Sequence, residues 1–416
     1  MNTQTPVPIL QGRRILLGVS GSIAAYKSAD LASKLTQAGA LVDVILTQAA
    51  ERFISPVTFQ SVTGRRAYTD ADLWGQEAHI LHVALAEEAE LLVIAPATAN
   101  TLAHLATGQA GSLLAIAALA ARCPLVIAPA MDARMFEHPA TQANLEVLRQ
   151  RGAIIAGPGE GRMASGLIGR GRMLEPTELL GYARLALGRN GPLAGHKLIV
   201  TAGGTQEPID PVRVIANRSS GKQGFALAQA ALDRGASVRL VTGPTSLETP
   251  VGAERIDART ASEMAAAVLE VAAEAEALLM AAAVADFRPE EYEPQKLKRG
   301  RGAPELRLVP ADDVLAMVAA QREKSGRPEV IVGFAAESQD VLANARTKLQ
   351  AKGLSLIVAN DITASDAGFA VDTNRVTLIE PSGSVQQLPL MTKAEVAEVV
   401  LQRVVEMLVQ HPAGQP

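Results

Sequence analysis

Residues 201–224 read TAGGTQEPIDPVRVIANRSSGKQG and join a short apolar run to an alanine-rich stretch. The apolar run, Lys197–Val200, is typical of a buried strand, and the residues after Gly221 follow a helical pattern. A glycine turn between a strand and a helix lets backbone N–H groups approach a phosphate closely. This turn is unusually long and carries four side chains that can bind anionic oxygens: Arg213, Asn217, Arg218 and Lys222. A simple nucleotide turn does not need them, so the junction predicts an α/β fold with a more elaborate site.

The strand–turn–helix order occurs twice. Arg14–Val19 and Lys197–Thr201 are the predicted strands, and Ala24–Gln37 and Gly221–Asp233 are the helices that follow them. Further continuous apolar runs are typical of parallel strands that helices cover on both faces. These runs are Leu91–Ala95, Pro124–Ala128, Ala277–Ala282, Val330–Phe334 and Leu356–Ala359. We therefore predict two doubly wound, Rossmann-like α/β domains with ligands at the carboxyl ends of the strands.

Glycine and proline mark a boundary between the two halves. Gly188–Gly195 reads GRNGPLAG, which is typical of a linker. It predicts one domain at residues 1–190 and a second at residues 191–416. The stretch Pro289–Pro304 is rich in proline, lysine and arginine, so we expect an exposed basic loop there.

Composition excludes several classes of protein. The chain has 416 residues, 48% of them hydrophobic and 20% charged, which is typical of a compact protein with two or three domains. Its net charge of -4 argues against a nucleic-acid binder, which would carry a basic excess. We find neither the pattern of a signal peptide nor an apolar run long enough to span a membrane. The single cysteine, Cys123, allows no disulfide within the chain, so a cytoplasmic protein is expected.

Polar residues follow three predicted strands of the first half. Gly21 and Ser22 lie in GVSGSIAAYK, residues 18–27, where they could bind a phosphate at a helix N-terminus. Thr47 ends the next strand, and Thr98 and Asn100 follow another. A plain tight turn and ordinary helix caps are the alternatives. Three polar strand ends favour a shared ligand site.

These segments resemble the flavin-binding cysteine decarboxylases. The resemblance implies FMN as cofactor, a trimer as assembly, and a catalytic histidine just before LLVIAPATAN, which falls on His82, with His79 as the alternative. It also implies that the flavin site contains Gly18, Ser20, Gly21, Ser22, Thr47, Thr98 and Asn100.

Two positions depart from that family's pattern. In PAMDARM, residues 129–135, Asp132 replaces an asparagine that would bond the substrate carboxylate. In GRMASGLIGRGRM, residues 161–173, Ser165 replaces a cysteine that would donate the last proton. A serine hydroxyl is a far weaker acid than a thiol, whose pKa is near 8.5. We hypothesise that Asp132 is held protonated and supplies the missing proton; the alternative is an impaired decarboxylase.

The second half resembles phosphopantothenate–cysteine ligase. This resemblance implies that CTP, with Mg²⁺ on its phosphates, activates 4′-phosphopantothenate as an acyl-cytidylate, and that the amine of L-cysteine displaces CMP. Asn217 would hold the acyl-cytidylate, Lys296 would close over it, and Arg213 would bind the phosphate or carboxylate of the substrate. Gly203, Gly204 and Thr205 would wrap the triphosphate.

The resemblance also implies a set of nucleotide-binding positions. Phe334 would stack on the base, Asp286 would read the base or ribose, and Ala281 and Ala282 would pass close to the cytosine. Lys348 and Lys352 lie four residues apart, and a solvated helix face is their alternative interpretation. The remaining members of the set are Met280, Ala311, Asp312, Asp313 and Val314.

Together the halves resemble the fused bacterial enzyme of coenzyme A biosynthesis, which assembles from decarboxylase trimers and ligase dimers into a dodecamer. One rival is a nicotinamide oxidoreductase, but neither turn has the G-x-G-x-x-G spacing that it requires. A second rival is a working ligase that carries a flavin-binding regulatory domain, which Asp132 and Ser165 leave open.

Overall fold

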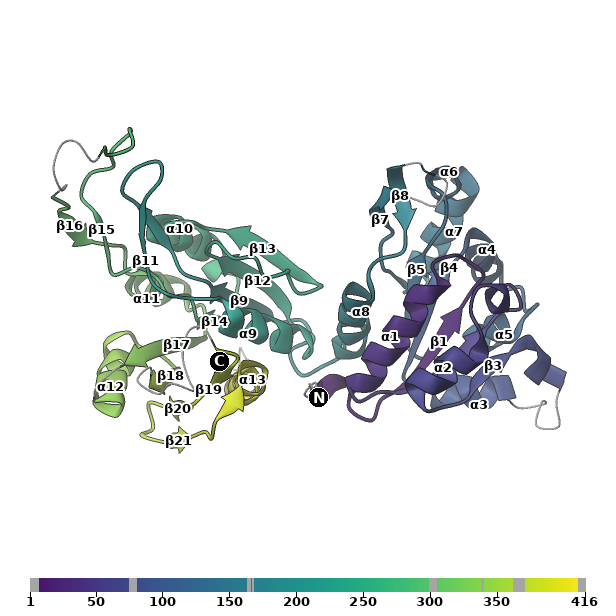
Figure 1. The fold of residues 1–416 in the computed structure, drawn as a ribbon. Helices are drawn as coiled ribbons and strands as arrows, with labels where there is room; N and C mark the ends of the chain where they lie inside the picture. Colours follow the sequence, from purple (N-terminus) through teal and green to yellow (C-terminus); the bar gives the residue numbers. More distant parts are fainter. Residues whose placement is uncertain are drawn as a thin grey trace. The chain divides into compact units, whose positions relative to one another are not determined.

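The computed structural model describes residues 7–74, 81–162, 166, 168–298, 305–337, 340–361 and 371–410. The chain divides into two compact units, Met1–Gly188 and Arg189–Pro416 (Figure 1). Each unit contains its own sheet and its own hydrophobic core. The predicted class of two doubly wound α/β domains is therefore confirmed.

The first unit is built on a parallel sheet with the strand order β3-β2-β1-β4-β5-β6. Its strands are β1 (Arg14–Val19), β2 (Leu41–Leu46), β3 (Ala67–Thr69), β4 (Leu91–Ala97), β5 (Leu125–Pro129) and β6 (Ile154–Ile155). Strands β1 and β4 are neighbours in the sheet but not in sequence. The strand order reverses there, and such a switch point opens a crevice at the carboxyl ends of the strands.

Helices cover both faces of this sheet because its strands are apolar on both sides. Leu31, Phe59 and Leu179 belong to the core on one face, and Leu102 and Leu145 to the core on the other. The first face carries α1 (Ala25–Gln37), α2 (Pro56–Thr63) and α8 (Pro176–Gly188). The second carries α3 (Leu81–Glu88), α4 (Ala99–Thr107), α5 (Leu113–Ala120), α6 (Ala133–Glu137) and α7 (Pro139–Gln150). Short 3-10 turns are η1 (Pro8–Leu10), η2 (Ala50–Arg52) and η3 (Asp70–Trp74).

A separate antiparallel pair extends from the first unit, β7 (Gly159–Arg162) with β8 (Ile168–Arg172). The amide of Met131 donates to the carbonyl of Gly171 at 3.0 Å. This bond ties the pair to the loop after β5, where PAMDARM begins.

The second unit contains a sheet with the order β13-β12-β9-β14-β17-β18-β20-β21. The parallel strands are β9 (Lys197–Ala202), β12 (Ser237–Thr242), β13 (Ala253–Asp257), β14 (Ala277–Met280), β17 (Val330–Glu337) and β18 (Leu356–Asp361). Strands β20 (Val376–Ile379) and β21 (Val385–Gln387) continue the sheet in antiparallel fashion. We did not predict these two strands, because they are short and β21 is polar.

Helices α10 (Ala261–Ala272), α11 (Val314–Ser325) and α12 (Val341–Ala351) pack on one face of this sheet. Helices α9 (Lys222–Leu232) and α13 (Lys393–Gln410) contact each other and the strands from the opposite side (Figure 1). Three small antiparallel pairs complete the unit: β10 (Gln206–Pro208) with β11 (Val214–Ala216), β15 (Phe287–Pro289) with β16 (Leu308–Pro310), and β19 (Thr373–Asn374) with β22 (Met391–Thr392).

One predicted strand ends early. We expected Ala277–Ala282, but β14 ends at Met280 because the amide of Ala281 turns back to the carbonyl of Leu279. The amide of Ala282 then bonds a hydroxyl on β9. The chain therefore changes direction after β14, near the carboxyl ends of the strands. The predicted basic loop starts in β15, and its described residues 290–298 are mostly exposed.

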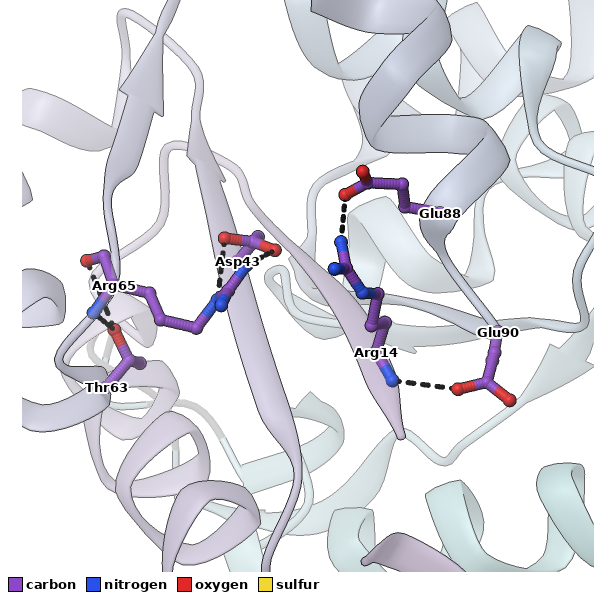
Figure 2. Close-up of polar contacts among 6 residues, drawn as sticks. All are labelled: Arg14, Asp43, Thr63, Arg65, Glu88 and Glu90. Atoms are coloured by element: carbon purple, nitrogen blue, oxygen red, sulfur yellow. Dashed lines mark hydrogen bonds and ion pairs between the residues drawn. The ribbon is translucent and has the colours of Figure 1, made fainter. Parts of the chain in front are cut away.

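A bidentate ion pair fixes the turn after α2 to the sheet of the first unit (Figure 2). Asp43 on β2 accepts from Arg65 Nε at 2.9 Å and from Arg65 Nη2 at 2.7 Å. The Asp43 side chain is only 10% exposed and that of Arg65 is 32% exposed. Figure 2 also shows Arg14 paired with Glu88, but both of these side chains are largely exposed. The first pair should therefore matter much more for stability than the second.

We expect Asp43→Ala to lower the free energy of unfolding of the first unit by about 2–3 kcal/mol, below the ~3–5 kcal/mol typical of a fully buried pair because Arg65 is partly exposed. Glu88→Ala, the matched control, should cost less than about 1 kcal/mol. The single tryptophan, Trp74, belongs to the first unit, so its fluorescence during urea unfolding measures both values. Equal losses in the two variants would contradict this interpretation.

Candidate functional site

A buried hydroxyl organises the switch point of the first unit. Ser20 is 1% exposed, and its Oγ donates to the carbonyl of Pro96 at 2.7 Å and accepts from the amide of Thr98 at 3.1 Å. The bond joins the ends of β1 and β4. Ser20, which we predicted to bind the cofactor, is thus already engaged in supporting the site.

A cavity of about 450 Å³ opens beside this switch point. It is lined by the start of α1, the PAMDARM loop and strand β8, through Ser22, Ile23, Ala24, Tyr26, Lys27, Ala130, Met131, Asp132, Arg162, Gly171, Arg172 and Met173. No side chain caps the N-terminus of α1. The amides of Ala25 and Lys27 bond the carbonyls of Ser22 and Ala24. The cationic side chains in the lining, those of Lys27, Arg162 and Arg172, therefore make the main contribution to a site that fits a ligand with a phosphate group.

Several predicted flavin residues have structural roles. A side chain at Gly18 would collide with Leu114, and one at Gly21 would collide with Ala49, so both glycines permit close packing. Thr98 caps α4 by accepting from the amide of Thr101 at 3.3 Å. Thr47 accepts from the amide of Ala50, and Asn100 is exposed on α4. Among the predicted flavin positions, only Ser22 lines this cavity.

The candidate histidine lies apart from the cavity lining. His82 is half-buried in the first turn of α3, and its Nδ1 is buried without a hydrogen-bond partner in the described part of the chain. His79 and Ser165 lie outside the described residues. Their roles stay predictions.

Asp132 is placed at the cavity as an N-cap. Its Oδ1 accepts from the amide of Arg134 at 3.1 Å and lies 3.4 Å from Arg134 Nε. The side chain is 19% exposed. A neighbouring guanidinium favours a charged carboxylate, whereas our hypothesis requires the protonated form.

Our sequence reasoning missed Lys27. Its side chain is 6% exposed, and its Nζ donates to the carbonyl of Met173 at 3.0 Å and to Glu175 Oε1 at 2.7 Å. The hydrogen bond from Lys27 lowers the pKa of Glu175. The charge of Arg172 lowers this pKa further, whereas burial opposes both effects. A lysine on the apolar face of a predicted helix was the available signal, because such a charge needs a partner.

Buried hydroxyls also support the second site. Thr201 and Thr205 are fully buried, and their Oγ1 atoms accept from the amides of Ala282 at 3.1 Å and Ala285 at 2.9 Å. Gly203 adopts a φ of 74° and bonds Ala283 through its carbonyl. The predicted triphosphate residues Gly203, Gly204 and Thr205 therefore hold the 281–285 loop, and they do not line the cavity beside it.

That cavity has a volume of about 390 Å³ and lies at the carboxyl ends of the central strands. It brings together five of the predicted residues: Asn217, Ala281, Ala282, Asp286 and Phe334. Residues 218–222 line the same space. Gly221, at the N-cap of α9 with a φ of 75°, has no side chain to cap the helix, and its own amide donates to Ser219 Oγ at 3.3 Å. Asn217 Nδ2 donates to the carbonyl of Val284 at 2.9 Å. An open helix N-terminus thus lies beside an amide and an aromatic ring.

Asp210 clamps two parts of this site together. Its Oδ1 accepts from the amides of Val212 and Arg213, both at 2.8 Å, and its Oδ2 accepts from Arg213 Nη1 at 2.6 Å and the amide of Leu297 at 3.1 Å. Burial alone would raise the pKa of Asp210, but these bonds outweigh it and lower the pKa to about 2. Arg213 also donates to the carbonyl of Leu297 at 3.2 Å. The clamp fixes the segment that carries the exposed Lys296.

The other predicted nucleotide residues lie away from the cavity lining. Met280 and Val314 are buried in the core. Asp313 caps α11 and pairs with Lys352, while Lys348 is exposed on α12. Asp312 is exposed, and the amide of Ala311 donates to the carbonyl of Asp286 at 2.9 Å.

Comparison with known proteins covers both units. The Flavoprotein family matches residues 7–184, and the DNA/pantothenate metabolism flavoprotein C-terminal domain family (DFP) matches residues 193–408. The coenzyme A biosynthesis bifunctional protein CoaBC of Bacillus subtilis is 44% identical over 399 residues, 95% of this chain and 97% of that protein. The chain belongs to the CoaBC family. CoaBC of Mycobacterium tuberculosis (strain ATCC 25618 / H37Rv) is 43% identical over 408 residues, 95% of this chain and 97% of that protein.

A solved structure of a CoaBC C-terminal domain is 35% identical, with a TM-score of 0.45, and covers 53% of this chain and 99% of that chain. Membership of the CoaBC family makes this protein a bifunctional enzyme of coenzyme A biosynthesis, with a flavoprotein decarboxylase domain and a ligase domain. The alternatives of a nicotinamide oxidoreductase and of a merely regulatory first domain are not favoured. Within the described residues, no helix is both long and apolar enough to cross a membrane.

We expect Asp210→Asn to slow the ligase by roughly 10²-fold, because an amide N–H₂ in place of Oδ2 would face two donors and release the Lys296 segment. Trypsin should then cut faster after Lys296 and Lys298, which limited proteolysis measures. Glu293→Gln, an exposed carboxylate change in the same segment, is the control. Unchanged cleavage in Asp210→Asn would contradict the clamp.

The lowered pKa of Asp210 also predicts a pH dependence. Its stabilising contribution is fully present above the ordinary pKa of 3.8 and is lost as the pH falls through about 2. Any loss of wild-type ligase activity between neutral pH and pH 5 should therefore come from other groups, and the proteolysis pattern should stay constant over that range.

Proposed function

We propose that this enzyme ligates 4′-phosphopantothenate to L-cysteine with CTP and then decarboxylates the adduct to 4′-phosphopantetheine with FMN. The observation that carries the ligase half is the cavity in which Asn217, Asp286 and Phe334 lie beside the open N-terminus of α9. A nucleotide needs such a combination of an anion site and an aromatic face.

In the proposed ligation, a carboxylate oxygen of the substrate attacks the α-phosphorus of CTP, and pyrophosphate leaves with the electrons of the broken P–O bond. The amine of cysteine then forms the C–N bond, CMP leaves with the electrons of the C–O bond, and the amine loses a proton. Asn217 can assist because an amide has two N–H donors. One bonds Val284, and the second can bond the developing oxyanion.

The phosphates of CTP, with Mg²⁺ on their oxygens, are proposed to lie at residues 218–222, because α9 begins at the cavity without a side-chain cap. Gly203, Gly204 and Thr205 would then support the wall of the site from behind. Arg213 is held by Asp210 and Leu297, so we propose that it binds substrate only with its remaining donors.

In the flavoprotein domain, Ser22 and the first turn of α1 are proposed to hold the phosphate of FMN, with Lys27, Arg162 and Arg172 as nearby cations. Bound FMN would supply the two-electron oxidation that precedes loss of carbon dioxide. Asp132 would contact the substrate at the same cavity.

His82 does not line the cavity of its own chain. A site that is completed between the subunits of a decarboxylase trimer would explain this position. The ligase domain would form dimers. The trimer contacts and the dimer contacts together would build the dodecamer.

We expect mass spectrometry of the reaction with 4′-phosphopantothenate, cysteine, CTP and magnesium to detect 4′-phosphopantetheine, because both halves then act in sequence. Omission of CTP should abolish all products. Arrest at the cysteine adduct would place the failure at decarboxylation, and absence of any adduct would reject the ligase function.

We propose that the substrate carboxylate keeps Asp132 protonated against the opposing effect of Arg134, so Asp132→Asn should reduce formation of the saturated product by roughly 10²- to 10⁴-fold, the usual contribution of a general acid. An enethiol lighter than 4′-phosphopantetheine by two hydrogens should accumulate instead, which the same mass spectrometry detects. Glu137→Gln, a change of an exposed carboxylate on α6, is the control. Normal amounts of 4′-phosphopantetheine from Asp132→Asn would reject Asp132 as the proton donor.

A further inference from the structure

One carboxylate of the flavoprotein domain joins two segments that are far apart in the sequence. Asp70 is the first residue of η3, and each of its oxygens accepts from a distant backbone amide. Oδ2 accepts from the amide of Gln48 at 3.2 Å, and Oδ1 accepts from the amide of Leu113 at 2.8 Å. Gln48 lies two residues after β2, and Leu113 is the first residue of α5. Asp70 therefore fixes the end of β2 relative to the start of α5.

The residue after each of these amides packs on a glycine of the β1–α1 junction, residues 18–24. Ala49 follows Gln48, and a side chain at Gly21 would collide with it. Leu114 follows Leu113, and a side chain at Gly18 would collide with it. The two neighbours thus lie directly against the backbone of the junction. Because a protein interior leaves no spare room, a shift of either neighbour must also shift the junction.

The β1–α1 junction leads directly into the cavity of the flavoprotein domain. Ser22, Ile23 and Ala24 line that cavity, and Ser22 follows Gly21. Asp70 itself does not line the cavity. Groups that bind a ligand keep their geometry only when the surrounding structure holds their backbone in place. The contacts through Ala49 and Leu114 supply such support from outside the cavity.

An ordinary helix cap does not account for both bonds of Asp70. A carboxylate is favourable at a helix N-terminus, so the bond to Leu113 alone would be a local interaction with α5. However, Ser112 already caps α5 by accepting from the amide of Ala115 at 3.2 Å. Gln48 belongs to no helix. The two bonds together act between segments, on both sides of the β1–α1 junction.

We propose that Asp70 is a positioning residue of the FMN site. By holding Gln48 and Leu113, it keeps Ala49 and Leu114 against the β1–α1 junction, and the junction then presents the start of α1 to the phosphate of FMN. The role of Asp70 rests on the proposed function of α1 as the FMN phosphate site. It predicts that a change at Asp70 weakens FMN binding although the residue does not touch the cofactor.

The test compares two carboxylates of η3 in the full-length holoenzyme. Asp70→Asn keeps one acceptor oxygen but turns an N–H₂ group toward a backbone amide, so one of the two bonds is lost. Asp72→Asn is the matched control, because Asp72 accepts from the amide of Thr69 at 2.7 Å, within the same short segment. Free FMN is measured by its fluorescence after ultrafiltration of a dilution series, which gives the Kd. We expect Asp70→Asn to raise the Kd for FMN by about 10-fold, near the lower limit for a lost hydrogen bond to a charged group, and Asp72→Asn to change it by less than about 2-fold.

Urea unfolding followed by Trp74 fluorescence separates positioning from a merely structural role. Both changes remove a bond from a carboxylate to a backbone amide, so we expect comparable losses of stability but a changed FMN affinity only in Asp70→Asn. An unchanged Kd in Asp70→Asn overturns the proposal. An equal rise of the Kd in both variants overturns it too, because reduced stability alone would then be the cause. An Asp70→Asn chain whose first unit does not fold assigns the residue to folding and counts against positioning. A wild-type chain that binds no FMN would instead reject the flavoprotein function, so the two failures are distinguishable.

Discussion

Both sites depend on buried hydroxyls at the ends of central strands. A parallel strand that ends inside the protein leaves backbone groups without ladder partners, and an unpaired buried group is costly. Ser20 takes over this role in the flavoprotein domain by bonding both Pro96 and Thr98. Thr201 and Thr205 do the same in the ligase domain for Ala282 and Ala285. In the ligase domain these bonds hold the loop whose Ala282 lines the cavity, and in the flavoprotein domain they join the ends of β1 and β4.

The helices near the two cavities have two kinds of N-terminus, with and without a side-chain cap. Thr98 caps α4 and Asp132 caps α6, so part of the N–H groups at those termini is satisfied within the protein. Helices α1 and α9 begin without a side-chain cap, and the first residues of both line a cavity. Because the positive end of a helix dipole favours anions, these two helix N-termini are where we propose that phosphate groups bind. Capping is thus as informative about the sites as the glycine turns.

Much of the fold could be predicted from sequence, because long parallel strands covered on both faces need continuous apolar runs. The runs at Leu91–Ala95 and Leu356–Ala359 are β4 and β18, and α9 follows the glycine turn as expected. Strands β20 and β21 could not be predicted, because short strands at the edge of a sheet carry no such pattern. The candidate sites were harder to predict from the sequence. Polar residues after a strand can line a cavity, as Asn217 does, or be buried against the neighbouring backbone away from it, as Thr205 is, and a sequence does not distinguish these cases.

The sequence by itself determined the family, the two-domain α/β architecture and the junction at residues 201–224, since hydrophobic periodicity and glycine spacing are local properties of the chain. Only the tertiary structure decided which polar groups share a cavity. Gln223, Asn360 and Asn374 are brought together by the pairing of β18 with β20, the β19–β22 ladder and the packing of α13 on α9. Likewise, Asp210 meets Leu297 only because the two loops fold over one another. Such contacts depend on register and packing between distant segments, which no local pattern encodes.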